Sequence, residues 1–388
     1  MKVAVLGGGN AGWATSAHLS LMGFDVCLCD LPEFSDTIEP VKKYGGIEIK
    51  QAEGVEIRGL PSGFAKIDCV TTDVSEAVRD ADLIFVLVPS YGQMRFAEAI
   101  TPHLRDGQVV VFTPGNLASI EVWRMWRRIG FERDVVLAET NTLPYLCFKS
   151  AYLSDWNIIR QFVVRPTIWI GYYKEKVRFS AFPAKDTDRA LKVVREVYPR
   201  YAKAKNVFET SLTNPNVMLH PAISLLNTGW IEATRWGFKF YTEGVTPSIG
   251  RVIEALESER LAVGRGLGID LSYMDWLVER GGVEFKGRVH EVLRGDKALT
   301  LFSELCVHEI DTDLNFMFIT EDVPYGLVPW ASLAEKLGVE TPIIRALIAI
   351  ASAVNETDYW SVGRSLERLG MGEMSVEEVK SFVENGLS

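Results

Sequence analysis

The stretch KVAVLGGGNAGWATSAHLSLMGFDVCLCD, residues 2–30, carries the strongest structural signal in the chain. A short apolar run opens directly into Gly7, Gly9 and Gly12, a helix-like segment follows, and a second apolar run ends at Asp30. Gly7 lets the strand turn tightly, Gly9 leaves room for a pyrophosphate, and Gly12 lets the helix pack closely against the strand. This order of elements predicts a βαβ unit that binds a dinucleotide.

The helix after the glycines and the acid after the second strand complete the predicted cofactor site. The first N–H groups of the helix, around Asn10 and Ala11, face the phosphates together with the positive end of the helix dipole. Asp30 follows Gly12 by 18 residues. There it can accept hydrogen bonds from the ribose 2′- and 3′-hydroxyls, and it would repel a 2′-phosphate. The sequence therefore favours NAD over NADP. A βαβ turn that binds no cofactor is the alternative, since glycine-rich turns are common.

Composition limits the class of protein. A chain of 388 residues is too long for one ordinary core, so we expect two domains. With 47% hydrophobic and 24% charged residues it resembles an ordinary globular protein, and its net charge of −10 argues against nucleic acid or an anionic membrane as a partner. Its apolar stretches are too short for a signal peptide or a membrane span, so we expect a cytoplasmic protein.

The cysteines are odd in number and spread along the chain, mostly inside apolar runs. This pattern predicts reduced thiols that fill small spaces in the core of a cytosolic protein. Since there is no CxxC motif and no Cys/His cluster at zinc spacing, we expect no structural metal. The residues are Cys27, Cys29, Cys69, Cys147 and Cys306.

After Asp30 the chain keeps alternating between strand-like and helix-like segments. Buried strands are predicted within 82–90, 108–113 and 134–139, with helices near 91–104 and 117–128. Such alternation builds a parallel sheet, and ligands bind at the carboxyl ends of its strands. We therefore add Pro89, just past one strand, to the predicted cofactor contacts.

The second half of the chain has a different pattern. Two alternating runs between 167 and 183 predict an antiparallel hairpin that extends the sheet, and a helix is expected from Asp186. Thr246 and Pro247 look like the cap and first residue of a helix, and helical patterns recur near 218–237, 286–309 and 330–354. We expect an α/β protein, with a Rossmann-type NAD-binding domain over 1–200 and a mainly α-helical domain over 201–388.

Reduction of C=O or C=N by a nicotinamide requires a proton donor with a pKa near the operating pH, which favours histidine. His220 is the candidate because it stands among polar residues with few charges, in NPNVMLHPAISLLNTG, residues 214–229. Pro221 suggests that a helix begins there. A structural histidine is the alternative. The others fit structural or surface positions: His18, His103, His290 and His308.

Several sequence blocks resemble the opine dehydrogenases, the octopine/nopaline dehydrogenase group, along most of the chain. The blocks occur in the family's order and are together far more specific than the glycine motif alone. They are GGGNAG (7–12), TPGN (113–116), AETNTLPY (138–145), FETSLTNPNVMLHPAISLLNTG (208–229), FYTEGVTPSIGRVIEALESERLAV (240–263), EDVPYGLVP (321–329) and GRSLERLG (363–370).

The resemblance implies a reaction and a catalytic pair. Opine dehydrogenases join the amino group of an amino acid to a 2-oxo acid and reduce the resulting imine with NAD(P)H, which gives a secondary amine dicarboxylate. Their His–Asp pair corresponds to His220 and Asp322. His220 would then be the general acid/base, and Asp322 would fix its tautomer. From the residues alone, Asp322 is equally consistent with an acid that begins a helix.

Other candidates depend on the same blocks. Asn116 and Thr142, at predicted strand ends, are expected to hold substrate or the carboxamide end of the cofactor, with turn-forming polar residues as the alternative. The segment 241–243 either faces the cleft or forms a solvated loop. Relatives often place a basic residue after the TLPY block, where this chain reads Leu-Cys-Phe. Three arginines remain open as partners of a substrate carboxylate: Arg160, Arg165 and Arg235.

Two other functions remain open on the sequence. One is reduction of a simple 2-oxo acid or polyol phosphate, as in hydroxyacid and glycerol-3-phosphate dehydrogenases. Those enzymes generally use a catalytic lysine, and the chain has none between Lys205 and Lys239. The other is a non-catalytic NAD(H)-binding sensor, which would not need a proton donor. The sequence does not determine the oligomeric state, and a homodimer through the helical domain is one possibility.

Overall fold

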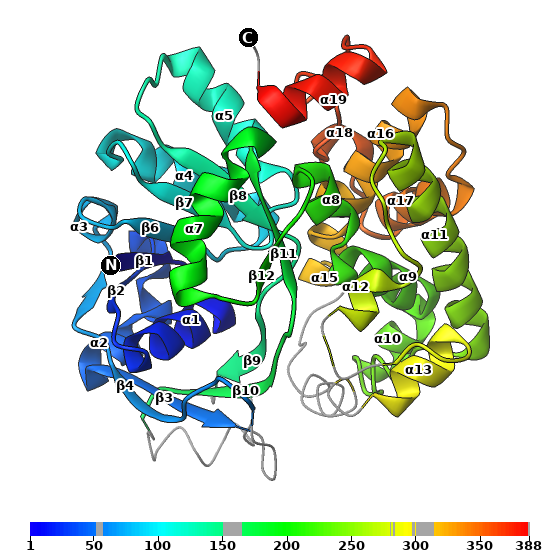
Figure 1. The fold of residues 1–388 in the computed structure, drawn as a ribbon. Helices are drawn as coiled ribbons and strands as arrows, with labels where there is room; N and C mark the ends of the chain where they lie inside the picture. Colours follow the sequence, from blue (N-terminus) through cyan, green and yellow to red (C-terminus); the bar gives the residue numbers. More distant parts are fainter. Residues whose placement is uncertain are drawn as a thin grey trace.

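The structure is a computed structural model that describes residues 1–51, 57–149, 165–279, 281, 284–296, 299 and 314–386. A sheet-based half and a helical half lie side by side (Figure 1). Among the described residues, none of the helices combines the length and the apolar character needed to cross a membrane.

An eight-stranded sheet forms the centre of the first half. Neighbouring strands are parallel, except that β8 and β11 are antiparallel. The predicted strands within 82–90, 108–113 and 134–139 are confirmed as β6, β7 and β8. The order across the sheet is β12 (Tyr201–Lys203), β11 (Val177–Phe182), β8 (Val136–Thr140), β7 (Val109–Phe112), β6 (Leu83–Val86), β1 (Lys2–Leu6), β2 (Asp25–Cys29) and β5 (Cys69–Thr71).

Both faces of this sheet are covered, because successive side chains along each strand point to opposite faces. In β1, Val3 and Val5 join a core that includes α1 (Asn10–Leu21) and α7 (Thr187–Val197). Ala4 and Leu6 join the core on the other face, which is covered by α3 (Val74–Val78), α4 (Ser90–Ile100) and α5 (Ala118–Ile129). The predicted helices near 91–104 and 117–128 are confirmed as α4 and α5.

A second sheet of four strands packs on α1. Its order is β4 (Gly63–Lys66), β3 (Gly46–Gln51), β10 (Thr167–Tyr173) and β9 (Tyr145–Lys149). The predicted hairpin over 167–183 is therefore wrong: β10 pairs with β3 and β9, whereas β11 pairs with β8 and β12. The connection 174–176 reads Lys-Glu-Lys and has no glycine or asparagine for a tight turn, so partners far away in the sequence determine the pairing.

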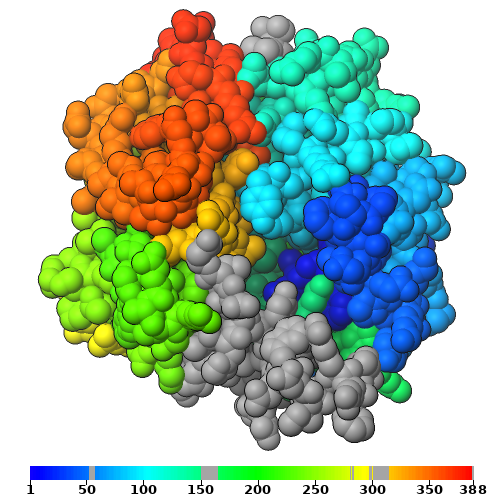
Figure 2. Space-filling view, turned by 180° about the vertical axis from the view of Figure 1, so that it is seen from behind, coloured from blue at the N-terminus to red at the C-terminus, as the bar shows by residue number. Residues whose placement is uncertain are grey.

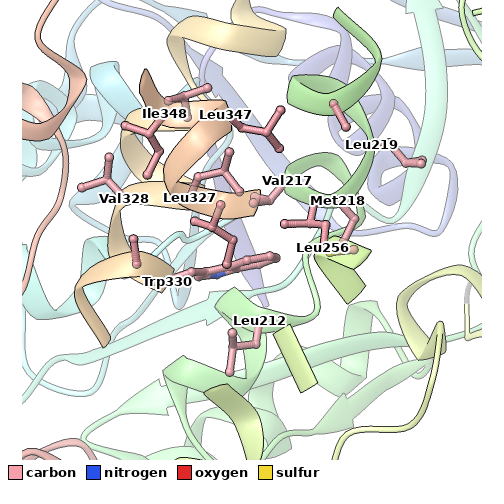
Figure 3. Close-up of a cluster of buried hydrophobic side chains, with 14 of the residues drawn as sticks. Leu212, Val217, Met218, Leu219, Leu256, Leu327, Val328, Trp330, Leu347 and Ile348 are labelled. Atoms are coloured by element: carbon pink, nitrogen blue, oxygen red, sulfur yellow. The ribbon is translucent and has the colours of Figure 1, made fainter. Parts of the chain in front are cut away.

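The second half is helical, as predicted. Its core contains Leu212, Met218, Leu256, Leu327 and Trp330, which converge from separate helices (Figure 3). The helices are α8 (Val207–Leu212), α9 (Pro215–Leu226), α10 (Thr228–Thr234), α11 (Pro247–Gly266), α12 (Asp275–Val278), α13 (Val289–Gly295), α15 (Met317–Thr320), η5 (Val323–Leu327), α16 (Val328–Leu337), α17 (Pro342–Val354), α18 (Tyr359–Val362) and α19 (Val376–Asn385). The remaining short helices of the first half are η1 (Pro32–Thr37), α2 (Glu39–Tyr44), η2 (Thr101–His103) and η4 (Ala184–Asp186).

The structure confirms some of the predicted helix boundaries and corrects others. Thr246 caps α11 by accepting a hydrogen bond from the Ile249 N–H, as predicted. The predicted helix over 330–354 is two helices, because Gly338 takes a left-handed conformation that ends α16. In the predicted helix 286–309 the described helix is α13, and residues 300–309 lie outside the described residues. Pro221 lies inside α9 rather than at its start, where Pro215 takes the first position.

The two halves meet along a long interface. The sheet ends with β12, the helical half begins with α8, and the division predicted at residue 200 stays a prediction. The last helix, α19, returns to the first half, where Phe382 packs against Trp123 and Phe182. Seen from behind, the blue-to-cyan and green-to-red parts form two lobes with a hollow between them (Figure 2).

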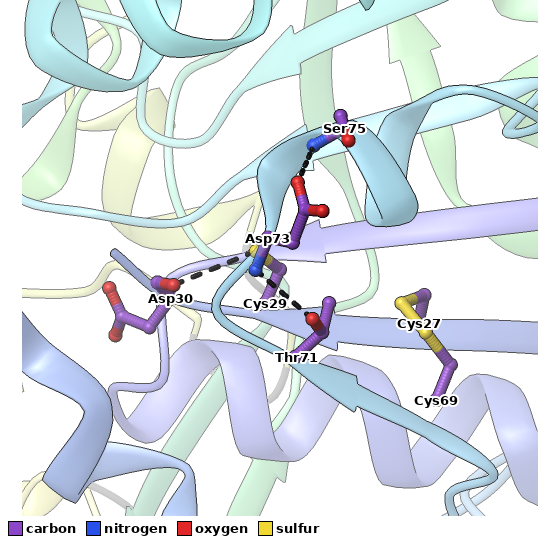
Figure 4. The surroundings of a disulfide bond; sticks show 7 residues. All are labelled: Cys27, Cys29, Asp30, Cys69, Thr71, Asp73 and Ser75. Atoms are coloured by element: carbon purple, nitrogen blue, oxygen red, sulfur yellow. Dashed lines mark hydrogen bonds between the residues drawn. A yellow bond between two sulfur atoms is a disulfide. The ribbon is translucent and has the colours of Figure 1, made fainter. Parts of the chain in front are cut away.

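The prediction of reduced thiols is wrong for two of the cysteines. A disulfide joins Cys27 of β2 to Cys69 of β5 (Figure 4). The two residues face each other in the register of these strands with Cα atoms 4.5 Å apart, which is within disulfide range. Cys29 and Cys147 are free and buried, as expected, and Cys306 lies outside the described residues.

Candidate active site

The glycine loop between β1 and α1 has the geometry that the motif predicts. Gly7 has a φ of +106°, and a Cβ there would lie 2.6 Å from the Leu87 carbonyl oxygen. A Cβ on Gly12 would lie 1.8 Å from the Gly7 carbonyl oxygen, so only glycine permits this close packing. At Gly9, which caps α1, a Cβ would meet no atom within 4 Å. The open space in front of α1 therefore fits a pyrophosphate.

Asp30 lies at the carboxyl end of β2, beside this loop, and is buried. Its carboxylate accepts hydrogen bonds from the Gly8 N–H at 2.7 Å, the Leu31 N–H at 2.8 Å and the Thr37 hydroxyl at 2.8 Å. A carboxylate has about four acceptor positions. Since three are engaged, Asp30 retains capacity for about one further hydrogen bond.

Gly8 and Lys149 belong to this site, although the motif does not indicate them. A Cβ on Gly8 would lie 2.1 Å from the Thr37 hydroxyl, so this glycine lets η1 close over the loop. Lys149, the last residue of β9, donates from Nζ to the Gly8 carbonyl and lies over the Trp13 ring at 4.3 Å. Its backbone N–H donates to the Asn10 side chain at 3.1 Å. Burial lowers the pKa of Lys149 to about 8.

His220 and Asp322, 102 residues apart in sequence, meet in the helical half. His220 lies in α9, and its Nδ1 is 2.7 Å from the Asp322 carboxylate, which follows α15. His220 Nε2 is 2.7 Å from the Tyr241 hydroxyl. Phe318 stacks on the imidazole with ring centres 3.8 Å apart. Both members of the pair are buried.

Burial sets the protonation of this pair. It lowers the pKa of His220 to about 3 and raises the pKa of Asp322 well above its usual value. Both shifts have one cause, since a buried site disfavours net charge. Both directions favour a form of the pair that carries no net charge.

A second buried acid stands next to this pair. Glu321 accepts hydrogen bonds from the Ser90 N–H at 2.9 Å and the Ser90 hydroxyl at 2.8 Å, and so joins the start of α4 to the helical half. Burial first, and then the adjacent Asp322, raises the pKa of Glu321 to about 7. The Ser90 hydroxyl accepts from the Asn116 side-chain amide at 2.9 Å, and the Asn116 side-chain oxygen accepts from the Asn214 amide at 2.9 Å. The side-chain amide of Asn116 is thus engaged at both ends.

Arg364, in the GRSLERLG block, fixes the turn that carries Asn116. Its buried guanidinium donates to the Asn116 carbonyl at 2.5 Å and to Glu121 of α5 at 2.8 Å. Asn116 and Leu117 both have positive φ, an uncommon conformation for residues other than glycine. The guanidinium thereby stabilises the turn from the opposite half of the molecule.

Thr142 is buried after β8, and its hydroxyl accepts a hydrogen bond from Lys174 Nζ at 2.5 Å. Burial lowers the pKa of His220 most, the charge of Glu321 opposes this shift, and the positive charge of Lys174 adds a smaller lowering. The arginines left open by the sequence do not converge here. Arg165 lies over Phe64 of the small sheet, Arg235 is exposed after α10, and Arg160 lies outside the described residues.

The remaining sequence candidates are distributed as follows. Pro89 precedes α4, beyond the carboxyl end of β6. His18 is structural, as predicted, but it is buried and bonded to the Tyr145 hydroxyl rather than on the surface. His103 is exposed, His290 is half-buried, and His308 lies outside the described residues. Within 241–243, Tyr241 lies against His220, so the reading of this segment as a solvated loop is wrong for that residue.

Comparisons with known proteins identify the family. The family NAD/NADP octopine/nopaline dehydrogenase, alpha-helical domain, matches residues 203–355. An opine dehydrogenase of Arthrobacter sp. (strain 1C) is 30% identical over 383 residues, which cover 98% of each chain. An octopine dehydrogenase structure with NADH and L-arginine has a TM-score of 0.73 at 18% identity, and covers 100% of this chain and 99% of that one. A yersinopine dehydrogenase structure with NADP+ has a TM-score of 0.67 at 14% identity, with coverage of 100% and 98%. The chain belongs to the opine dehydrogenase family, the NAD(P)H-dependent oxidoreductases that act on CH–NH donors by reductive condensation.

Proposed function

We propose that this chain condenses the amino group of an amino acid or amine with a 2-oxo acid such as pyruvate, and reduces the imine with NADH to an N-(carboxyalkyl) amino acid. The contact of 2.7 Å between His220 and Asp322 carries the proposal, because it pairs a proton donor with an acid that orients it. The octopine dehydrogenase structures are described with NADH and L-arginine, pyruvate or agmatine. These ligands indicate the classes to test first.

The cofactor site is assigned to the glycine loop and its neighbours. Bound NADH supplies the hydride. The open space at Gly9 and the first N–H groups of α1 would hold the pyrophosphate, and Asp30 would accept a hydrogen bond from the adenosine ribose. The assigned residues are Gly7, Gly9, Asn10, Ala11, Gly12, Asp30 and Pro89. NADH is favoured over NADPH, since a 2′-phosphate beside the Asp30 carboxylate would place two negative groups together.

His220 acts as the acid that the condensation needs. The reaction consumes a proton at the oxygen or nitrogen of the reacting carbon, and His220, hydrogen-bonded to Asp322 at 2.7 Å, is placed to supply it. Asp322 fixes the imidazole orientation and stabilises the imidazolium when it forms. The stacked Phe318 ring and the burial of both side chains limit access of water, which would hydrolyse the imine.

One substrate carboxylate is assigned to Thr142 and Lys174. Lys174 offers a positive charge at the carboxyl end of β8, and the Thr142 hydroxyl lies within hydrogen-bond distance of it. A hydroxyl and an ammonium group suit a carboxylate, although they lack the planar fork of an arginine. Asn116 is engaged with Ser90 and Asn214, so its contribution is to shape the turn beside the substrate.

The test of the reaction is NADH oxidation at 340 nm with 2-oxo acids, alone and with amino acids or amines. Turnover that requires both substrates supports condensation. Turnover with an oxo acid alone would instead make the chain a hydroxyacid dehydrogenase. His220→Ala should lower kcat by about 100-fold or more without changing NADH affinity, whereas His103→Ala, at an exposed histidine, should change neither.

The test of cofactor preference compares binding of NADH and NADPH. Asp30→Ala should lower the affinity for NADH by about 10-fold or more, because a hydrogen bond to a charged group is lost. The affinity for NADPH should fall far less. Asp25→Ala, at an exposed acid on the same strand, is the matched control. Equal losses for the two cofactors would contradict the role of Asp30.

A further inference from the structure

Tyr241 stands where the substrate would have to meet His220. The Nδ1 of His220 is engaged by Asp322, so Nε2 is the nitrogen through which a proton can leave the pair. The Tyr241 hydroxyl lies 2.7 Å from that Nε2. A proton that leaves Nε2 therefore reaches the tyrosine oxygen before any substrate atom.

The tyrosine is held in this position by its own segment. Residues 239–244 form a turn in which the Glu243 N–H donates to the Lys239 carbonyl at 2.7 Å. The turn is bonded to α9, the helix of His220, because Asn227 at the end of α9 donates to the Gly244 carbonyl at 3.0 Å. On the other side, Arg294 of α13 donates to the Thr242 carbonyl at 2.9 Å. Tyr241 and His220 are thus anchored to the same helix.

The surroundings of the pair favour transfer through a fixed hydroxyl rather than through bulk water. Phe240 packs edge-on against the Tyr241 ring, with ring centres 4.9 Å apart, and Phe318 stacks on His220. Tyr241 is 4% exposed and His220 is 7% exposed. Swinging the tyrosine ring away would disrupt this packing, whereas a proton can pass through its hydroxyl without moving the ring.

We propose that Tyr241 is a proton relay between His220 and the substrate, a role that rests on the function proposed above. In the transfer step the Tyr241 O–H bond breaks as its proton goes to the oxygen or nitrogen of the substrate. A new O–H bond forms at the same oxygen with the Nε2 proton of His220. His220 loses one proton, the substrate gains one, and Tyr241 ends as it began. The step involves no change of oxidation state.

Tyr241→Phe tests the relay, because it removes the hydroxyl and keeps the ring. We expect kcat to fall by about 100-fold or more, the usual contribution of a positioned acid, with NADH affinity measured by fluorescence unchanged. Tyr201→Phe is the control, since it removes a buried tyrosine hydroxyl in β12, outside the site. Turnover of Tyr241→Phe within threefold of the wild-type value would overturn the relay.

Two further readouts separate a relay from a structural role. Because relay and acid act as one unit, the double variant His220→Ala/Tyr241→Phe should be no slower than His220→Ala alone. The kcat of the wild-type enzyme, plotted against the fraction of D2O in the solvent, should follow the curved line expected when two protons move in the rate-limiting step. Multiplied losses in the double variant, or a straight line for one proton, would overturn the relay and leave the proposed function standing. Normal turnover of His220→Ala would instead overturn the proposed function itself.

Discussion

Replacing Asp322 with asparagine removes the acid of the proposed catalytic pair with little change of shape. In the wild-type protein the carboxylate lies 2.7 Å from Nδ1 of His220, and both side chains are buried. An asparagine amide that donates to Nδ1 would keep this nitrogen unprotonated, so the ring could not form the imidazolium that supplies the Nε2 proton. It also carries no charge to stabilise the imidazolium.

The geometry gives the size of the effect. Removing one partner from a buried, hydrogen-bonded charge pair costs about 3–5 kcal/mol. This energy is lost where the imidazolium forms, so it enters the activation free energy of proton transfer. At about 1.4 kcal/mol per tenfold change, kcat should fall by roughly 100- to 5000-fold.

The assay is NADH oxidation at 340 nm with saturating substrates, alongside NADH affinity measured by fluorescence. We expect kcat to fall and NADH affinity to stay unchanged, since the cofactor loop lies in the other half of the molecule. Asp358→Asn, at an exposed acid that caps α18, controls for loss of a carboxylate in the helical half. A kcat for Asp322→Asn within threefold of the wild-type value would refute the assignment of Asp322.

Two further predictions concern the cofactor loop and the second buried acid. Gly9→Ala should keep the stability of the wild-type protein, because its methyl group enters open space, but should lower NADH affinity, because that space is assigned to the pyrophosphate. Gly12→Ala should lower the free energy of unfolding by about 1–3 kcal/mol or more, because its methyl group would meet the Gly7 carbonyl. Urea denaturation and NADH titration check both, and normal NADH affinity in Gly9→Ala would contradict the placement of the pyrophosphate. The pKa of Glu321 is raised to about 7 in the folded protein, so between roughly pH 4.5 and 7 the folded chain binds more protons than the unfolded one and stability falls as pH rises. Glu321→Gln should reduce this fall in urea midpoints across the window, and an unchanged slope would show that Glu321 is not protonated there.

The sequence was most informative where the physical requirement is local. Gly7, Gly9 and Gly12 each answer a steric condition within a few residues, so the loop could be predicted in atomic terms. The pairing of β10 and β11 could not, because each strand pairs with partners far away in the sequence. The disulfide between Cys27 and Cys69 has the same cause, since only the register of β2 and β5 brings those residues together.

The same distinction between local and distant requirements applies to the residues of the candidate site. His220 could be selected from its own neighbourhood, but Asp322 came only from resemblance, because no local spacing relates residues 102 positions apart. The sequence does not determine the position of Tyr241, because the segment 241–243 before a capped helix fits both a cleft-facing segment and a solvated loop. The sequence does not indicate that Lys149 lies at the glycine loop, because this lysine donates to the Gly8 carbonyl, a backbone group present in every residue.

The position of Arg364 has a consequence for how this molecule can be divided. The turn after β7, with two consecutive residues at positive φ, is held by a guanidinium that is synthesised about 250 residues later. The sheet-based half therefore depends on the helical half, and transferring it alone to another protein would leave that turn without its support. Arg364 and the returning helix α19 make the two halves interlocked, so they must be inherited, exchanged and engineered together.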